Sequence, residues 1–338
     1  MMHMKKTIIT IGILCTSLVA FQHMLPYKKI SPEQINVAIQ KSLHRLEYSS
    51  HDFLANADGC HSCHGQSLGS IAFFMANEKG FTVSKHEWQE AIDSMSNSIH
   101  RNRATYIECT DPVALAIGRG YDLWALSINK VPPNKDIHLL VRDLMTRQSM
   151  NGSWGSPSSR PPLEGSTYTA TALAAYGIQA YAPPVWKDKV NICIDKARKW
   201  LEVQMPYTNE EKTYQLLGLH WTGGHPDTIR NHAQKLLTAQ RPDGGWSQLP
   251  TLESDAYATG QSLYALSATG QLSTQNPIYE KAVSFLVNTQ KKDGSWLVKT
   301  RSFAAVPFVD SGFPHGDHQY ISAAGTAWAT MVLTQTVK

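Results

Sequence analysis

The sequence predicts an all-α fold built from helical hairpins, on three observations. A Gln…Gly-x-Trp signature occurs at residues 148–154, 240–246 and 290–296. The first two copies start 92 residues apart and the last two 50, so a degenerate copy is expected near Gln204. Charged amphipathic segments alternate with segments rich in Ala, Gly, Ser and Thr, and no strand pattern of comparable strength is present.

A repeat unit of about fifty residues accommodates two helices and their loops. We predict charged outer helices over residues 32–47, 84–100, 135–149, 187–203, 227–239 and 277–289. We predict small-residue inner helices over residues 62–76, 111–128, 165–181, 210–221, 255–269 and 319–335. Helix pairs of this kind bury a face against their neighbours, and six pairs can close into a ring with no open end.

Composition sets the broad class of the protein. With 42% hydrophobic and 17% charged residues, the chain can bury a large core, which excludes a disordered protein and a polytopic membrane protein. The net charge of +4 is unclustered and does not indicate nucleic-acid binding.

The N-terminus predicts export. Lys5 and Lys6 precede an apolar run over residues 7–21, which is short for a bilayer span and typical of a signal peptide. We therefore expect residues 1–30 to be a signal peptide or an N-terminal anchor, and residues 31–338 to form the helical domain. The protein is then periplasmic, or associated with the membrane through its N-terminus at the periplasmic face of the inner membrane.

The segment Cys60-His61-Ser62-Cys63-His64 matches the C-x-x-C-H pattern of covalent haem attachment. Two thiols at this spacing can each form a thioether to the haem, while His64 reaches the iron as an axial ligand. Export supports this interpretation, because c-type haem attachment usually occurs outside the cytoplasm. We predict a haem c held by Cys60, Cys63 and His64.

The three Gln…Gly-x-Trp turns resemble the QW repeats of terpenoid cyclases and protein prenyltransferases. Residues 311–314 (Ser-Gly-Phe-Pro), followed by a Tyr-bearing inner helix, are similar to the C-terminal region of squalene-hopene cyclases. The C-x-x-C-H motif together with residues 313–328 resembles exported bacterial prenyltransferase and squalene oxidase repeat proteins. The resemblance covers roughly residues 55–337 and implies an (α/α)6 toroid, with inner and outer helix rings, but it does not fix an activity.

Cyclases of this type use a D-x-D-D or D-D-x-x-D acidic cluster, and neither pattern occurs here. The nearest catalytic candidate is Asp255, which also suits the N-cap of a helix. A hollow within the ring would bind a hydrophobic, isoprenoid-like molecule. Eight aromatic residues on the predicted inner helices can line that hollow or serve as core packing: Trp124, Tyr168, Tyr176, Trp221, Tyr257, Tyr264, Tyr320 and Trp328.

Closure of a six-pair ring places the first inner helix beside the sixth. The loop before the sixth helix carries His315, Asp317 and His318, so we expect it to meet the Cys-His motif at one mouth of the ring. In the haem interpretation, His315 or His318 is the distal ligand or a hydrogen-bond donor to bound oxygen or peroxide.

Two other interpretations of the motif stay open. Asp58 and Cys60 with a histidine near the last inner helix (His315 or His318) are similar to the zinc ligands of protein prenyltransferases, and Cys63-His64-Gly65 resembles the zinc motif of lanthionine-forming cyclases. Alternatively, Cys60 and Cys63 form a disulfide or remain as thiols at a helix start.

The functional prediction is an exported toroid with a metal centre, haem c first and zinc second, at the mouth of an apolar cavity. It binds a hydrophobic molecule and acts on it as an oxidoreductase, or passes electrons to a partner protein. The alternatives are a zinc-dependent enzyme of the cyclase or prenyltransferase type and a toroid that binds a ligand without catalysis.

Overall fold

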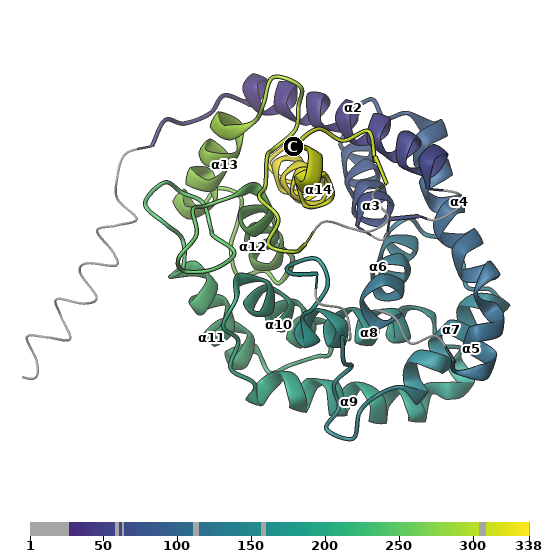
Figure 1. Cartoon of the computed structure of the whole chain (residues 1–338). Helices are drawn as coiled ribbons and strands as arrows, with labels where there is room; N and C mark the ends of the chain where they lie inside the picture. The colour runs from purple at the N-terminus through teal and green to yellow at the C-terminus, as the bar shows by residue number, and fades with distance from the viewer. Residues whose placement is uncertain are drawn as a thin grey trace, which may run out of the picture.

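The computed structural model describes residues 27–57, 61–62, 64–110, 115–156, 160–303 and 309–337. Within these ranges the chain forms helices and loops, with two isolated β-bridges. The helices form two concentric rings (Figure 1). The outer ring contains α2 (Pro32–Asn56), α4 (Lys85–Arg101), α7 (Lys135–Thr146), α9 (Lys187–Val203), α11 (Pro226–Leu237) and α13 (Pro277–Thr289). The inner ring contains α3 (Gly65–Glu78), α6 (Leu115–Ile128), α8 (Thr167–Tyr181), α10 (Asn209–Trp221), α12 (Ala256–Ala268) and α14 (Gln319–Thr334).

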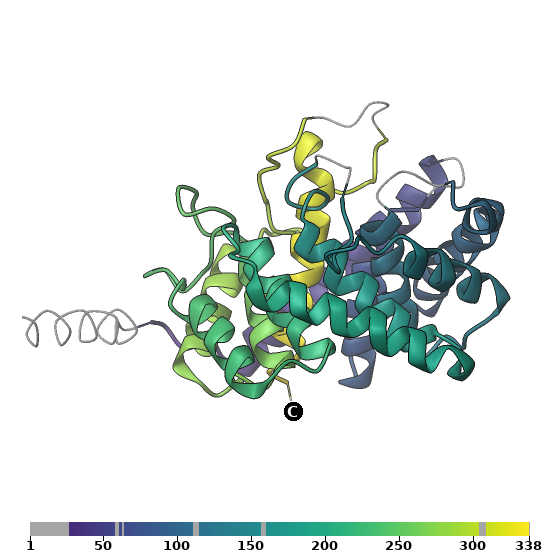
Figure 2. The same cartoon turned by 90° about the horizontal axis from the view of Figure 1, so that it is seen from below.

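The inner ring is closed. Each inner helix contacts the next inner helix along the chain, and α14 contacts α3. The first and sixth inner helices are therefore neighbours, which confirms the predicted all-α ring of six helical hairpins. Figure 2 shows the loop before α14 rising from one end of the ring, with the C-terminus at the other. We call the first end, where the inner helices begin and the loops before α8 and α14 lie, the mouth.

Helix starts follow from local sequence. Ser31 and Thr208 form capping boxes at α2 and α10, and Asp255 caps α12 by accepting a hydrogen bond from the Ala258 amide. Small residues let the inner helices approach closely. A Cβ on Gly260 of α12 would lie 2.7 Å from the Cβ of Trp328 on α14, so only glycine fits at this crossing.

The Gln…Gly-x-Trp turns join neighbouring outer helices. The Gln240 amide donates to the carbonyls of Gly244 (2.9 Å) and of Ile278 on α13 (2.8 Å). The indole of Trp246 donates to the Leu236 carbonyl of α11 at 2.8 Å. Gly244 has φ of +93°, and a Cβ there would lie 2.6 Å from the Lys281 carbonyl oxygen. The other two copies make the same bonds, and Gln290 reaches the Ala38 carbonyl of α2, which links the last outer helix to the first.

The structure differs from the predicted helices in the following places. The first outer helix continues to Asn56 instead of ending at residue 47, because no glycine or proline interrupts it before Gly59. A short helix, α5 (Arg103–Glu108), was not predicted. At the degenerate copy expected near Gln204, α9 ends at Val203, and the Gln204 carbonyl accepts a hydrogen bond from the Gln215 side chain of α10. No helix in the described part of the chain is long and apolar enough to cross a bilayer.

Candidate functional site

A cavity of about 320 Å³ lies at the mouth, between the end of α2, the start of α3 and the loops before α8 and α14. Its volume lies at the lower end of the range for small-molecule pockets. Apolar side chains form much of its wall, among them Phe53, Leu163, Phe303 and Ile321. The polar side chains that face it include His61, His64, Arg160, Glu164, Asp317 and Tyr320.

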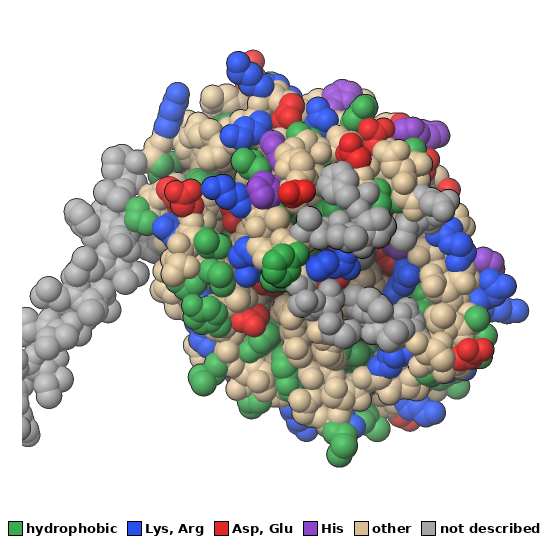
Figure 3. Space-filling model, viewed as in Figure 1, with side chains coloured by type: hydrophobic (Ala, Val, Ile, Leu, Met, Phe, Trp, Pro, Cys, Tyr) green, Lys and Arg blue, Asp and Glu red, His purple; other side chains and the backbone are tan. Residues whose placement is uncertain are grey.

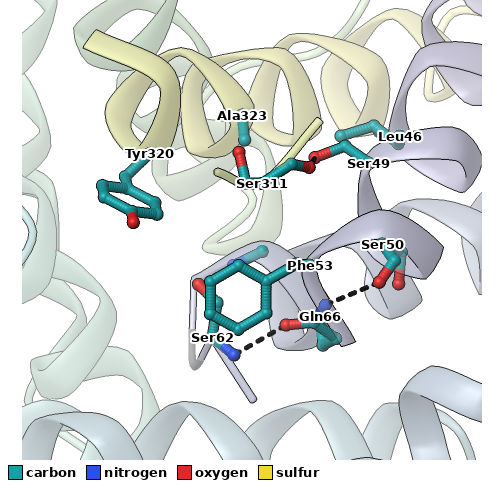
Figure 4. A pocket seen from close by; sticks show the side chains of 10 residues that line it. Leu46, Ser49, Ser50, Phe53, Ser62, Gln66, Ser311, Tyr320 and Ala323 are labelled. Atoms are coloured by element: carbon teal, nitrogen blue, oxygen red, sulfur yellow. Dashed lines mark hydrogen bonds between the residues drawn. The ribbon is translucent and has the colours of Figure 1, made fainter. Parts of the chain in front are cut away.

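Hydrogen bonds to Gln66 and within the segment itself hold the C-x-x-C-H segment at this cavity. The Ser62 amide donates to the Gln66 side chain at 2.7 Å, and the Gln66 amide donates to the Ser50 carbonyl of α2 at 3.1 Å (Figure 4). The Ser62 hydroxyl accepts from the Gly65 amide at 2.9 Å. These bonds fix the entry into α3 against α2. Asp58, Cys60 and Cys63 lie outside the described residues, so their predicted roles as ligands stay predictions.

His64 is buried in the wall of the cavity. Its Nε2 lies 2.9 Å from the Leu163 carbonyl oxygen, and its ring packs edge-on against Tyr121 of α6 at 5.0 Å between ring centroids. Burial lowers the pKa of His64 and outweighs the nearby Glu164 carboxylate, which raises it. The imidazole is therefore neutral near pH 7, the form that binds a metal.

His61 is a second histidine at the cavity, and its role was not predicted from the sequence. Its Nε2 lies 2.9 Å from Oδ1 of Asp122, a fully buried carboxylate on α6. Asp122 also accepts hydrogen bonds from Ser67 and Arg119, each at 2.9 Å. Burial raises the pKa of Asp122, but His61 and Arg119 outweigh burial and hold the pKa below its usual value. The signal in the sequence was the Arg-x-x-Asp pair on an inner helix that carries no other charge.

The loop before α14 reaches the mouth, but its two histidines do not line the cavity among the described residues. His315 Nε2 lies 2.9 Å from the Ser295 hydroxyl in the third Gln…Gly-x-Trp turn, and burial lowers its pKa. His318 Nδ1 accepts a hydrogen bond from the Thr300 amide at 3.4 Å. Asp317 is the charged residue of this loop that lines the cavity, beside Thr300, Ser302, Phe303 and Val309. The predicted convergence of the loop with the motif therefore brings a carboxylate, rather than His315 or His318, to the wall.

Asp255 is the N-cap of α12, as the capping alternative predicted. Its Oδ1 accepts from the Ala258 amide at 2.8 Å and its Oδ2 from the Gln248 side chain at 2.9 Å. Burial raises the pKa of Asp255 to about 6. Asp255 lines a separate open groove of about 480 Å³ between the second and third turns. Asp255 does not line the mouth cavity, and its role as a catalytic acid stays a prediction.

A second buried acid, Glu210 on α10, was missed by the sequence reasoning. Its carboxyl accepts hydrogen bonds from Tyr257 (2.9 Å) and Gln261 (2.8 Å) of α12 and from Thr169 (2.9 Å) of α8. Burial raises the pKa of Glu210 to about 7, against the lowering effect of these donors and of Arg301. The available signal was a carboxyl at the start of an inner helix. Acidic residues are common in the first turn because they interact favourably with the helix dipole, so Glu210 did not stand out.

For most of the eight aromatic residues on the inner helices, the structure favours the core-packing alternative. Trp124 of α6 lies 5.7 Å, between ring centroids, from each of Trp221, Tyr264 and Trp328. Since α6 and α12 face each other across the ring (Figure 1), these side chains meet across its centre and fill it at this level. Tyr176 packs edge-on against Trp221 at 4.8 Å between ring centroids, and Tyr168 packs against Trp200 of the outer ring. Of the eight residues, Tyr320 lines the mouth cavity.

The described residues contain no group of three or more His, Cys, Asp or Glu side chains that could hold a metal ion. The further candidate ligands at the mouth, Asp58, Cys60 and Cys63, lie outside the described residues. The described part of the site would offer a bound metal or haem the neutral imidazole of His64 and a mostly apolar wall. Arg160 also faces the cavity, paired with Glu164.

Comparison with known proteins supports the fold. Residues 211–338 match the family described as the squalene-hopene cyclase C-terminal domain. The structure resembles the type II terpene cyclase MstE from Scytonema, with a TM-score of 0.53 and 13% identity over 89% of this chain and 98% of that chain. It also resembles an MstE variant in complex with geranylgeranyl dihydroxybenzoate, with a TM-score of 0.51 and 14% identity over 88% and 99% of the two chains. A search of curated proteins found no match. The chain thus has an α/α toroid fold like that of the terpenoid cyclases.

Proposed function

We propose that this toroid binds a hydrophobic, isoprenoid-like molecule in its mouth cavity, beside a haem c attached to Cys60 and Cys63. The observation that carries the proposal is that His61, Ser62 and His64, three residues of the C-x-x-C-H segment, all line this cavity. A motif typical of haem attachment therefore lies at a partly apolar pocket that can receive a ligand.

The residues around the cavity fit a haem. His64 is neutral and sits in a buried wall, as an axial ligand requires, and Phe53, Phe303 and Ile321 supply apolar surface. Arg160 would offer a cation to the carboxylates of the porphyrin. When bound, the haem would supply one-electron chemistry. In this proposal the protein orients the hydrophobic molecule against that group and limits the access of water.

Two findings support a hydrophobic ligand. The cavity wall is mostly apolar, and a solved protein with the same fold holds geranylgeranyl dihydroxybenzoate. The centre of the ring is filled by aromatic side chains, so we place the ligand at the mouth rather than deep in the ring. The proposal includes export to the periplasm, where c-type haem is attached. It also includes an electron-transfer partner that restores the oxidation state of the haem iron.

The test is an absorption spectrum and a whole-protein mass of the full chain, co-expressed with the c-type cytochrome maturation system. We expect a Soret band and a mass increased by one covalent haem, both lost in the variant Cys60→Ala, Cys63→Ala. Cys109→Ala is the matched control, because Cys109 is exposed and outside the motif, and it should keep both signals. An unmodified mass and no Soret band in the wild type would overturn the haem proposal.

A zinc enzyme is the second candidate, and one observation favours it. His61 and His64 each bond through Nε2 to an acceptor, the Asp122 carboxylate and the Leu163 carbonyl. Metal-bound histidines usually have such a partner on the other ring nitrogen. Stoichiometric zinc that is lost in Cys60→Ala and in His64→Ala would establish this candidate. A chain with neither haem nor zinc, but with ligand affinity unchanged by those substitutions, would be a non-catalytic binding toroid.

A further inference from the structure

The N-terminal end of the described chain is fastened to the outer wall of the ring. The hydroxyl of Tyr27 donates to Glu280 of α13, and the Lys29 ammonium lies 2.9 Å from the same carboxylate. The Ser284 hydroxyl of α13 donates to the Lys28 carbonyl at 3.0 Å. Residues 27–31 therefore run along α13 before α2 begins.

Basic residues gather on the same wall, which we call the α2–α13 edge. It comprises α2, α13, residues 27–31 and the turn after α13. The turn is fixed to α2, since Gln290 donates to the Ala38 carbonyl at 2.9 Å and Arg45 to the Asp293 carbonyl at 3.4 Å. Figure 3 shows Lys and Arg side chains over this face, with Asp and Glu side chains among them. Apart from the buried Lys281, six cations lie along the edge: Lys28, Lys29, Lys41, Arg45, Lys291 and Lys292.

Five carboxylates share the edge and offset only part of the charge at its surface. Glu280 is bonded to Tyr27 and Lys29, and Asp293 accepts hydrogen bonds from Ser295. The other three belong to α2: Glu33 is exposed, Asp52 is half-buried and Glu47 is buried. Lys28, Lys41, Lys291 and Lys292 are exposed, so the edge presents net positive charge to its surroundings.

Chain geometry ties this edge to the apolar run of residues 7–21. Six peptide steps separate Phe21 from Tyr27, and a fully extended chain covers about 3.5 Å per residue, so the run ends within about 20 Å of Tyr27. Wherever that run enters a bilayer, the α2–α13 edge is the part of the domain held nearest to the lipid.

We propose that the α2–α13 edge is a docking surface for an anionic membrane, with its lysines against lipid phosphates. Each Lys or Arg at an anionic surface contributes about 1 kcal/mol, roughly fivefold in partitioning. The edge is a side wall of the ring, so the ring axis then runs along the membrane and the mouth opens to the aqueous side. This proposal does not depend on the haem.

The test measures partitioning of the full chain to vesicles of phosphatidylcholine alone and to vesicles that also contain phosphatidylglycerol. The ratio of the two partition coefficients isolates the electrostatic part, because the apolar run contributes to both. The edge variant carries Lys28→Gln, Lys41→Gln, Lys291→Gln and Lys292→Gln. The control removes the same charge from α9, on the far side of the ring (Figure 1): Lys187→Gln, Lys189→Gln, Lys196→Gln and Lys199→Gln.

We expect the wild-type ratio to exceed one, to fall at least tenfold in the edge variant, and to change little in the α9 control. High salt should reduce the wild-type ratio as well, because it screens exposed charges. Equal partitioning of the wild type to both vesicles would overturn the proposal. So would an equal loss in the α9 control, which would show a response to total charge rather than to this edge. Circular dichroism of each variant checks that the helices are intact.

Discussion

At the scale of single residues, burial sets the protonation of the acids inside the ring. Glu210 is held by the neutral donors Tyr257, Gln261 and Thr169, and its pKa is raised to about 7. Asp122, equally buried, has two cationic or protonatable partners and keeps its charge. The two carboxyls differ in their partners: Glu210 has neutral donors from α8 and α12, whereas Asp122 has Arg119 of its own helix and His61 from the segment before α3.

The titration of Glu210 makes stability depend on pH. The unfolded chain releases this proton near pH 4.5, whereas the folded chain holds it until about pH 7. Stability is therefore highest below pH 4.5 for this group and falls as the pH rises through 7. The total loss is about 3 kcal/mol, from a pKa difference of about 2.5 units.

We predict that Glu210→Gln removes this part of the pH dependence. Urea unfolding of wild type and variant between about pH 5 and pH 8 should give a smaller loss of stability in the variant. Asp255 contributes in the same direction in both proteins, so the difference between them isolates Glu210. Identical slopes in the two proteins would show that Glu210 is already ionised at pH 5.

At the scale of elements, the three Gln…Gly-x-Trp turns tie α7 to α9, α11 to α13 and α13 to α2. The glutamine amide bonds the turn itself and a carbonyl on the adjacent outer helix, while the tryptophan indole bonds the helix that has just ended. The spacing of Gln and Trp is thus a structural requirement of the hairpin. It identifies the fold and carries no information on the site.

We predict that Gln240→Ala destabilises the protein by about 1–3 kcal/mol, because two carbonyls lose their donor in a mostly buried setting. Chemical unfolding monitored by circular dichroism measures the change. Gln275→Ala is the control, since Gln275 is exposed and bonds only the neighbouring Thr274, and it should be near neutral. Equal effects of the two substitutions would contradict the structural role of the turn.

At the scale of the whole molecule, the ring is closed twice over. The α14–α3 contact closes the inner helices and the Gln290–Ala38 bond closes the outer ones. Its centre is filled by aromatic side chains from helices that are not neighbours in the ring. Trp124 is the shared partner in these contacts, so it links opposite walls.

We predict that Trp124→Ala destabilises the protein by about 3–5 kcal/mol and opens an apolar cavity in the centre of the ring. Such a cavity should take up a small aromatic molecule such as indole, measured by calorimetry. Trp186→Ala, at a half-buried position on the outer wall, should cost less and bind no indole. A Trp124→Ala protein as stable as the wild type would mean that the centre is not held by this cluster.

The sequence by itself determined the hairpins, their order and the closed ring, because helix periodicity, caps and turn signatures are local properties. It also marked the mouth, since closure places the C-x-x-C-H segment beside the loop before α14. The tertiary structure decided which side chains meet there. It brought Asp122 to His61, turned His315 toward Ser295, buried Glu210 among neutral donors and filled the centre with Trp124 and its partners. Each of these depends on distances between residues far apart in the chain, which no local pattern encodes.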